Sequence, residues 1–136
     1  MRSHKLRLFV CVLVCAICLL VGCGSRKQSP TGDGTYLMEV NMKGGSGRAS
    51  IASPTKVFLR NGDATAIIEW SSPNYDYMVV DDKRFLPMDD GGNSTFEIPV
   101  KAFDEPLEVI GDTTAMSQPH EITYTLTFDS STAQRL

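Results

Sequence analysis

The stretch HEITYTLTF, residues 120–128, carries the clearest structural signal in this sequence. Its even positions hold histidine, isoleucine, tyrosine, leucine and phenylalanine, whereas its odd positions hold glutamate and threonine. A period of two is the repeat of a β-strand that turns one face towards a core. The stretch therefore predicts a strand that directs His120 and Tyr124 to the same side.

The same period describes most of the chain upstream of this strand, and no window keeps a helical period. Further strands are predicted at Tyr36–Met42, Lys56–Arg60, Ala64–Ser71, Tyr75–Val80, Lys83–Met88, Phe96–Val100 and Leu107–Ile110. The turn residues between them include Asn61-Gly62, the dipeptide best suited to a type I′ hairpin turn. Pro99 indicates a strand at a sheet edge or a strand end.

Short strands separated by turns at intervals of about ten residues are typical of antiparallel sandwiches and barrels. We expect an all-β antiparallel sandwich of about eight strands over residues 35–129. Residues 130–136 are expected to form a disordered tail.

The N-terminus predicts an export signal. A basic start precedes an apolar run, Leu8–Leu20, that is shorter than the about 20 residues of a membrane-spanning helix. The run ends in Leu20-Val21-Gly22-Cys23, which resembles the bacterial lipobox, with a leucine three positions before the cysteine and a small residue directly before it. The resemblance implies that residues 1–22 are a lipoprotein signal peptide and that Cys23 carries diacylglycerol and palmitate.

Two or three acyl chains hold a protein durably on a bilayer, so we expect a lipid-anchored protein on the outer side of the cell membrane. The alternative is an uncleaved N-terminal anchor, which also places the remaining chain outside the cytoplasm. Residues 24–34 contain no apolar side chain, so residues 23–34 are expected to be the lipidated cysteine and a flexible tether.

Removal of the signal changes which functions remain open. The chain from Cys23 onward has ten basic and sixteen acidic side chains, a formal charge of −6, and it retains one of the four cysteines. The negative charge argues against nucleic acid as a partner. With the sulfur of Cys23 lipidated, no disulfide and no thiolate metal site is available.

Catalysis is not expected. His120 is the only histidine after the signal, and no Gly-x-Ser-x-Gly motif presents a serine nucleophile. Acidic turns such as Asp89, Asp90 and Asn93 leave calcium binding as an alternative to solvated turns. The methionines are dispersed, which favours core positions over a copper site.

Tyr75-Asp76-Tyr77 places two tyrosines on one face of a predicted strand beside a turn. Tyr75 and Tyr77 are therefore a candidate contact surface for a flat ligand or a sugar. The alternative is that this face is the core side of the strand.

From the glycine-rich break to Asp129, the order of elements resembles the NEAT (near-iron transporter) domain. The likeness rests on three parts of the sequence, which are TKVFLRNG followed by a strand ending in WSS (residues 55–72), NSTFEIPV with PLEV (residues 93–109), and YTLTFD (residues 124–129). The resemblance implies an immunoglobulin-like β-sandwich that binds haem.

In that family the last hairpin carries Tyr-x-x-x-Tyr, in which the first tyrosine ligates the haem iron and the second hydrogen-bonds to the first. Here the matching positions read His-x-x-x-Tyr, so the resemblance implies His120 as the axial iron ligand and Tyr124 as its supporting residue. The family's lip over the haem corresponds to residues 44–53, where Ser46 and Ser50 are the candidate contacts.

Two functions follow. The first is a membrane-anchored module that binds haem or an iron-containing ligand for uptake, with an envelope transporter or surface protein as partner. The second is a non-catalytic envelope interaction module that binds a protein or a glycan.

Overall fold

The computed structural model describes residues 30–88, 91–115 and 120–136, and within these residues the regular structure is entirely β. The eight strands are β1 (Gly34–Gly44), β2 (Thr55–Arg60), β3 (Asp63–Glu69), β4 (Tyr75–Val80), β5 (Lys83–Phe85), β6 (Thr95–Val100), β7 (Leu107–Thr113) and β8 (His120–Arg135). The prediction of an antiparallel all-β domain of about eight strands is confirmed.

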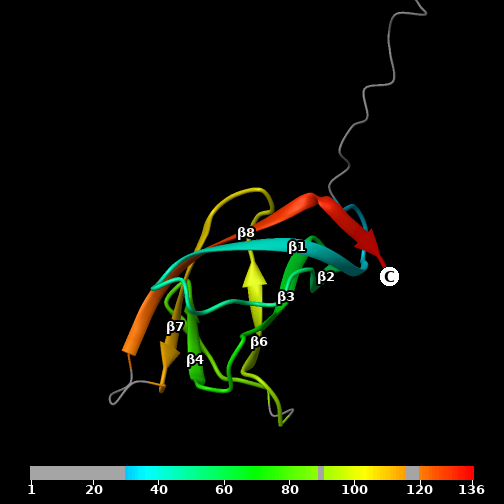
Figure 1. Cartoon of the computed structure of the whole chain (residues 1–136). Helices are drawn as coiled ribbons and strands as arrows, with labels where there is room; N and C mark the ends of the chain where they lie inside the picture. Colours follow the sequence, from blue (N-terminus) through cyan, green and yellow to red (C-terminus); the bar gives the residue numbers. More distant parts are fainter. Residues whose placement is uncertain (1–29, 89–90, 116–119) are drawn as a thin grey trace, which may run out of the picture.

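All strands belong to one antiparallel sheet in the order β5-β4-β7-β8-β1-β2-β3-β6. The sheet curls until its ends approach each other, since β6 contacts β4 and β5, and the Met88 N–H just after β5 donates to the Thr95 carbonyl of β6 at 2.7 Å. In Figure 1, β1 and β8 run side by side across the top of the remaining strands. The result is a nearly closed, immunoglobulin-like sandwich.

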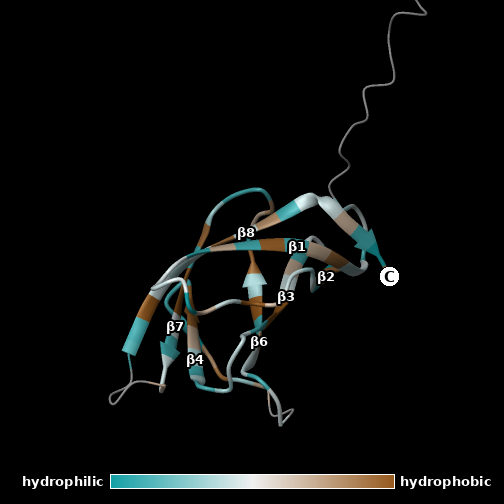
Figure 2. Ribbon diagram, in the orientation of Figure 1, coloured by the Kyte–Doolittle hydropathy of each residue, from teal (hydrophilic) through white to brown (hydrophobic). Residues whose placement is uncertain are grey.

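The interior is filled by the alternate side chains that the sequence pattern assigns to it. Along β8, Tyr124, Leu126 and Phe128 are buried, and Met38 and Val40 of β1 face the same core. Hydrophobic and hydrophilic residues alternate along these strands (Figure 2). Each fully buried side chain of this size stabilises the fold by roughly 1.5–3 kcal/mol.

Turn chemistry also follows the prediction. Asn61 and Gly62 both have positive φ angles, 51° and 82°, as a type I′ turn between β2 and β3 requires. Pro99 lies in β6, which is an edge strand of the sheet. An edge strand tolerates proline, because it pairs with a neighbour on one side only.

The expectation of a disordered tail from residue 130 is wrong, because β8 continues to Arg135. Arg135 pairs with Tyr36 of β1, and its guanidinium donates to the Asp33 carbonyl at 2.7 Å. Ser130 is buried, and both its N–H (2.9 Å) and its hydroxyl donate to the Asp104 carboxylate. Backbone pairing and these polar contacts hold a segment that has no apolar pattern.

The last residues of the expected tether are also bound to the domain. The Tyr36 hydroxyl is shared between two carbonyl acceptors, that of Gly32 at 2.9 Å and that of Thr31 at 3.0 Å. Asp33 accepts a hydrogen bond from the Asn61 N–H at 2.8 Å. Residues 1–22 and Cys23 lie outside the described residues, so the signal peptide and the lipid anchor stay predictions. In the part of the chain that the structure describes, no helix has the length and apolar character needed to cross a membrane.

Candidate functional site

The predicted ligand residues lie on β8, at the start of the hairpin that it forms with β7. His120 pairs with Thr113 and is exposed, whereas Tyr124 pairs with Val109 and is only 2% exposed. At about 3.3 Å per residue, the two positions lie roughly 13 Å apart along the strand. The chain therefore places one solvent-accessible imidazole and one buried phenol on the same face, too far apart to chelate a single ion.

Tyr124 belongs to a cluster of three aromatic side chains in the core. Trp70 stacks on Tyr75 with a centroid distance of 4.0 Å and an interplanar angle of 16°. It meets Tyr124 edge-on, at 5.1 Å and 62°. Such pairs contribute about 0.5–1.5 kcal/mol beyond the burial of their area. The Trp70 indole N–H is buried without a hydrogen-bond partner in the described residues, so stacking rather than polar contact holds this ring.

Two glycines close this cluster. A Cβ on Gly45 would lie 2.9 Å from Cε1 of Tyr124, and a Cβ on Gly111 would lie 3.1 Å from Cζ2 of Trp70. Gly44, the neighbour of Gly45, pairs with Tyr124 across the β1–β8 ladder. The predicted lip thus begins directly over the Tyr124 ring, where only a residue without a side chain fits.

The environment of Tyr124 decides its protonation state. Burial raises the pKa of its phenol well above the usual value, and the nearby Tyr75 hydroxyl, 3.5 Å away, raises it further. Tyr124 is therefore a neutral phenol at physiological pH. A neutral, buried phenol suits a hydrogen-bonding role rather than that of an anionic metal ligand.

The serines of the predicted lip lie in different surroundings. Ser46 is exposed in the turn after β1. Ser50 is tied to the end of β3, because its N–H donates to Ser71 Oγ at 3.2 Å and its carbonyl accepts the Ser71 N–H at 2.9 Å. The next residue, Ile51, forms an antiparallel bridge with Trp70. The second half of the lip is therefore extended and paired with the chain after β3.

The tyrosines of β4 do not share one face, contrary to the sequence-based prediction. The β4–β7 register shifts between Tyr75 and Tyr77, so the strand carries an irregularity at Asp76. Tyr75 is 7% exposed and lies in the core, whereas Tyr77 is turned outward and partly exposed. The irregularity gives β4 one extra residue relative to β7. As a result, Met78 and Val80, rather than Tyr77, are buried after it.

Tyr77 forms an outer polar contact instead. Its hydroxyl donates to Glu121 Oε1 at 2.5 Å, and the Arg84 guanidinium lies 3.9 Å from the ring centroid. The hydrogen bond to Glu121 raises the pKa of Tyr77 to about 12. This contact ties β4 to the strand that carries His120.

A buried carboxyl lies beside this contact. Asp112 of β7 is 3% exposed, and burial, followed by its hydrogen bond with Asp76, raises the pKa of its carboxyl. No group of three or more histidine, cysteine or acidic side chains that could hold a metal ion occurs among the described residues. Asp89 and Asp90, two of the alternative calcium ligands, lie outside them.

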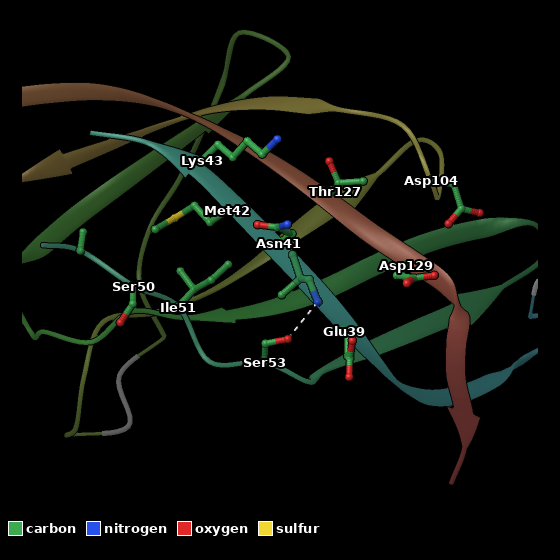
Figure 3. Close-up of a pocket in the computed structure, with 12 residues that line it drawn as sticks. Glu39, Asn41, Met42, Lys43, Ser50, Ile51, Ser53, Asp104, Thr127 and Asp129 are labelled. Carbon is green, nitrogen blue, oxygen red and sulfur yellow. Dashed lines mark hydrogen bonds between the residues drawn. The ribbon is translucent and has the colours of Figure 1, made fainter. Parts of the chain in front are cut away.

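The sequence did not reveal an open groove of about 790 Å³ beside β1 (Figure 3). Its lining comes from β1 (Glu39, Val40, Asn41, Met42 and Lys43), from the segment after β1 (Ala49, Ser50, Ile51 and Ser53), and from Asp104, Thr127 and Asp129. Of the predicted site residues only Ser50 lies there. His120, Tyr124 and Ser46 do not line it.

The fold, but not the sequence, is similar to that of known proteins. No family model matches the sequence, and no curated protein matches it significantly. The fold itself is that of a NEAT domain. The chain is similar to the NEAT5 domain of IsdX2, a B. anthracis hemophore, solved in complex with heme, at a TM-score of 0.56 and 12% identity, over 73% of this chain and 98% of that one. A point mutant of IsdX2-NEAT5 in complex with heme has the same score and identity, over 74% and 98%.

Proposed function

We propose that this protein is a lipid-anchored, extracytoplasmic lipoprotein whose NEAT-like domain binds haem, or a related iron-containing ligand, for uptake. The observation that carries the proposal is the likeness of the fold to NEAT domains solved with heme, combined with the chemistry of the β7–β8 hairpin. That hairpin presents an exposed imidazole, His120, at the first residue of β8, where it pairs with Thr113. It is proposed as a binding module without catalytic activity.

The residues present fit a haem group. An imidazole is a good axial ligand for haem iron, and His120 carries the only imidazole after the predicted signal. On the same face of β8, Tyr124 lies under Gly45 rather than under a bulky side chain, and Trp70 meets its ring edge-on at 62°.

Haem, when bound, would supply an iron centre, and the chain would supply the ligand and the enclosure. His120 would hold the iron through a ring nitrogen. Tyr124 would keep its proton as a neutral phenol, with its hydroxyl beside that of Tyr75 at 3.5 Å, and would line the site without contacting His120.

Haem binding is tested with a soluble chain of residues 24–136, which includes every strand of the sheet. Added hemin should give a Soret band distinct from that of free hemin, and His120→Ala should shift the band and weaken binding. Thr123→Ala changes an exposed residue on the opposite face of β8 and should leave the spectrum unchanged. A spectrum identical to that of free hemin, or one insensitive to His120→Ala, would refute the proposal.

Lipid anchoring is tested separately in cells. Metabolic labelling with an alkyne analogue of palmitate should mark the full-length protein in the membrane fraction. Cys23→Ser should abolish the label, whereas Cys18→Ser, inside the signal, should retain it. Equal labelling of the Cys23→Ser protein would argue against lipidation at this residue.

The second candidate function is an envelope interaction module that binds a protein or a glycan. It is supported by the burial of Tyr124 and by the groove beside β1, whose lining includes neither His120 nor Tyr124. Tyr77 is partly exposed on the outer surface, where it contacts Glu121 and Arg84, whereas Tyr75 is buried and offers no surface contact. Retention of an envelope partner that depends on Tyr77 and is indifferent to hemin would favour this function.

A further inference from the structure

The groove of Figure 3 exists because β1 has a partner on only one side over its second half. The β1–β2 ladder ends at Met38, which pairs with Thr55, whereas the β1–β8 ladder continues to Gly44. The described residues place no strand along the other edge of β1 between Val40 and Gly44. A free strand edge presents a row of backbone donors and acceptors to any extended chain.

The segment before β2 is held away from this edge by its own pairing with β3. Ala52 donates to the Glu69 carbonyl at 2.9 Å, and Ile51 bridges to Trp70. Its one hydrogen bond to the edge comes from Val40, whose N–H donates to Ser53 Oγ at 3.0 Å. Residues two apart on a strand direct their backbone groups to the same side, so the N–H and carbonyl of Met42 also point into the groove.

The floor of the groove is apolar. Met42, Ala49 and Ile51 are half-buried and pack against the core. The free edge from Val40 to Gly44 extends over about 13 Å at 3.3 Å per residue, which is room for a strand of roughly four or five residues. Backbone groups at the edge and an apolar floor below them are the two elements of strand addition.

The rim is acidic. Glu39 and Asp129 are direct partners across the β1–β8 ladder and are both exposed, and like charges in this arrangement repel each other. Asp104 lies close by, because its carboxylate accepts the Ser130 N–H next to Asp129. Among the described residues of the lining, Lys43 is the one cationic side chain. The Asp129 carboxylate accepts the Ser131 N–H at 3.0 Å, and a cation placed over Glu39 and Asp129 would be attracted by both carboxylates.

We propose that this groove binds an extended, basic segment of a partner polypeptide, which adds as a strand to the free edge of β1 between Val40 and Gly44. Its apolar side chains would contact Met42 and Ile51, and its lysine or arginine side chains would lie over Glu39 and Asp129. The groove includes neither His120 nor Tyr124, and it shares with the proposed haem site only residues of the predicted lip, Ser50 among them.

The test uses the isotopically labelled chain of residues 24–136 and a short capped peptide of alternating lysine and valine. In NMR titration the amide shifts should concentrate at Asn41–Lys43 and at Ala49–Ile51, and hydrogen exchange of the Met42 amide should slow. Glu39→Gln should raise the Kd roughly twofold to fivefold. Glu97→Gln, a matched change of an exposed carboxylate on β6, should leave the Kd unchanged.

Two further peptides separate strand addition from simple charge attraction. The same peptide with its backbone amides N-methylated on one edge should bind far more weakly, and an alternating glutamate–valine peptide should not bind. Equal binding of the N-methylated peptide, equal weakening by Glu39→Gln and Glu97→Gln, or no binding of the basic peptide would each overturn the proposal.

Discussion

Tyr124 offers the sharpest test of how the core is built, because its ring and its hydroxyl have separate roles. The ring is enclosed by Trp70, Gly45 and Gly111 and is 2% exposed. The hydroxyl has one neighbour, the Tyr75 hydroxyl at 3.5 Å, which is longer than the 2.5–3.0 Å of an ordinary O–H···O bond. Removal of the ring should therefore cost much more than removal of the hydroxyl.

The magnitudes follow from this geometry. Truncation of a buried aromatic ring to alanine costs about 3–5 kcal/mol, a large part of the roughly 5–15 kcal/mol that stabilises a domain. Tyr124→Ala should lower the free energy of unfolding by that amount and the Tm by more than about 10 °C. Tyr124→Phe should cost less than about 1 kcal/mol, because it removes only a long hydrogen bond.

Urea denaturation followed by the fluorescence of Trp70 provides the assay, since Trp70 is the single tryptophan of the chain and contacts Tyr124 directly. Tyr77→Ala serves as the control, because Tyr77 is only partly buried on the outer side of β4 and its truncation should cost much less than that of Tyr124. Loss of a cooperative transition in Tyr124→Ala counts as the expected large destabilisation. If Tyr124→Ala costs less than Tyr77→Ala, or if Tyr124→Phe costs as much as Tyr124→Ala, the reasoning fails.

Three further outcomes are expected. Gly45→Ala should destabilise the fold more than Gly47→Ala does in thermal melts, because both glycines have positive φ (66° and 80°) but only Gly45 has an aromatic ring 2.9 Å from the added Cβ. Equal melting temperatures would contradict this close contact. The wild-type Asp112 carboxyl has a raised pKa in the folded state, so the wild type should lose stability as the pH rises above about 4. Asp112→Asn lacks this carboxyl and should therefore become more stable relative to the wild type over the same range. Urea titrations at several pH values measure the difference. A stability difference that does not change with pH would exclude this burial effect. Glu121→Gln should lower the pKa of Tyr77 from about 12 towards the ordinary value in an absorbance titration of tyrosinate, because the hydrogen bond to the carboxylate is the main cause of the shift. An unchanged pKa would show that the contact is absent in solution.

The extent to which the sequence predicted the fold depends on the kind of signal at each position. Alternation in HEITYTLTF placed Tyr124, Leu126 and Phe128 in the core, and Asn61-Gly62 located the β2–β3 turn. Both signals are local, because side-chain direction and positive φ are properties of neighbouring residues. Such features are visible before any tertiary contact is known.

The failures have a different origin. Residues 130–135 carry no apolar pattern, yet they form the end of β8 because β1 offers them a backbone ladder and Asp104 binds Ser130. Tyr75 and Tyr77 were assigned one face because the irregularity at Asp76 has no signature in the sequence. A register shift depends on the partner strand, which a single sequence does not display.

The predicted site shows the same division. The sequence by itself determined that His120 and Tyr124 share one face of a strand and that His120 carries the only imidazole after the signal, because alternation and composition are written along the chain. Only the tertiary structure decided that Tyr124 is a neutral, buried phenol under a glycine turn and that β1 keeps a free edge beside an acidic groove. Burial, proton affinity and edge exposure depend on segments far apart in the sequence, which meet only after the sheet has closed.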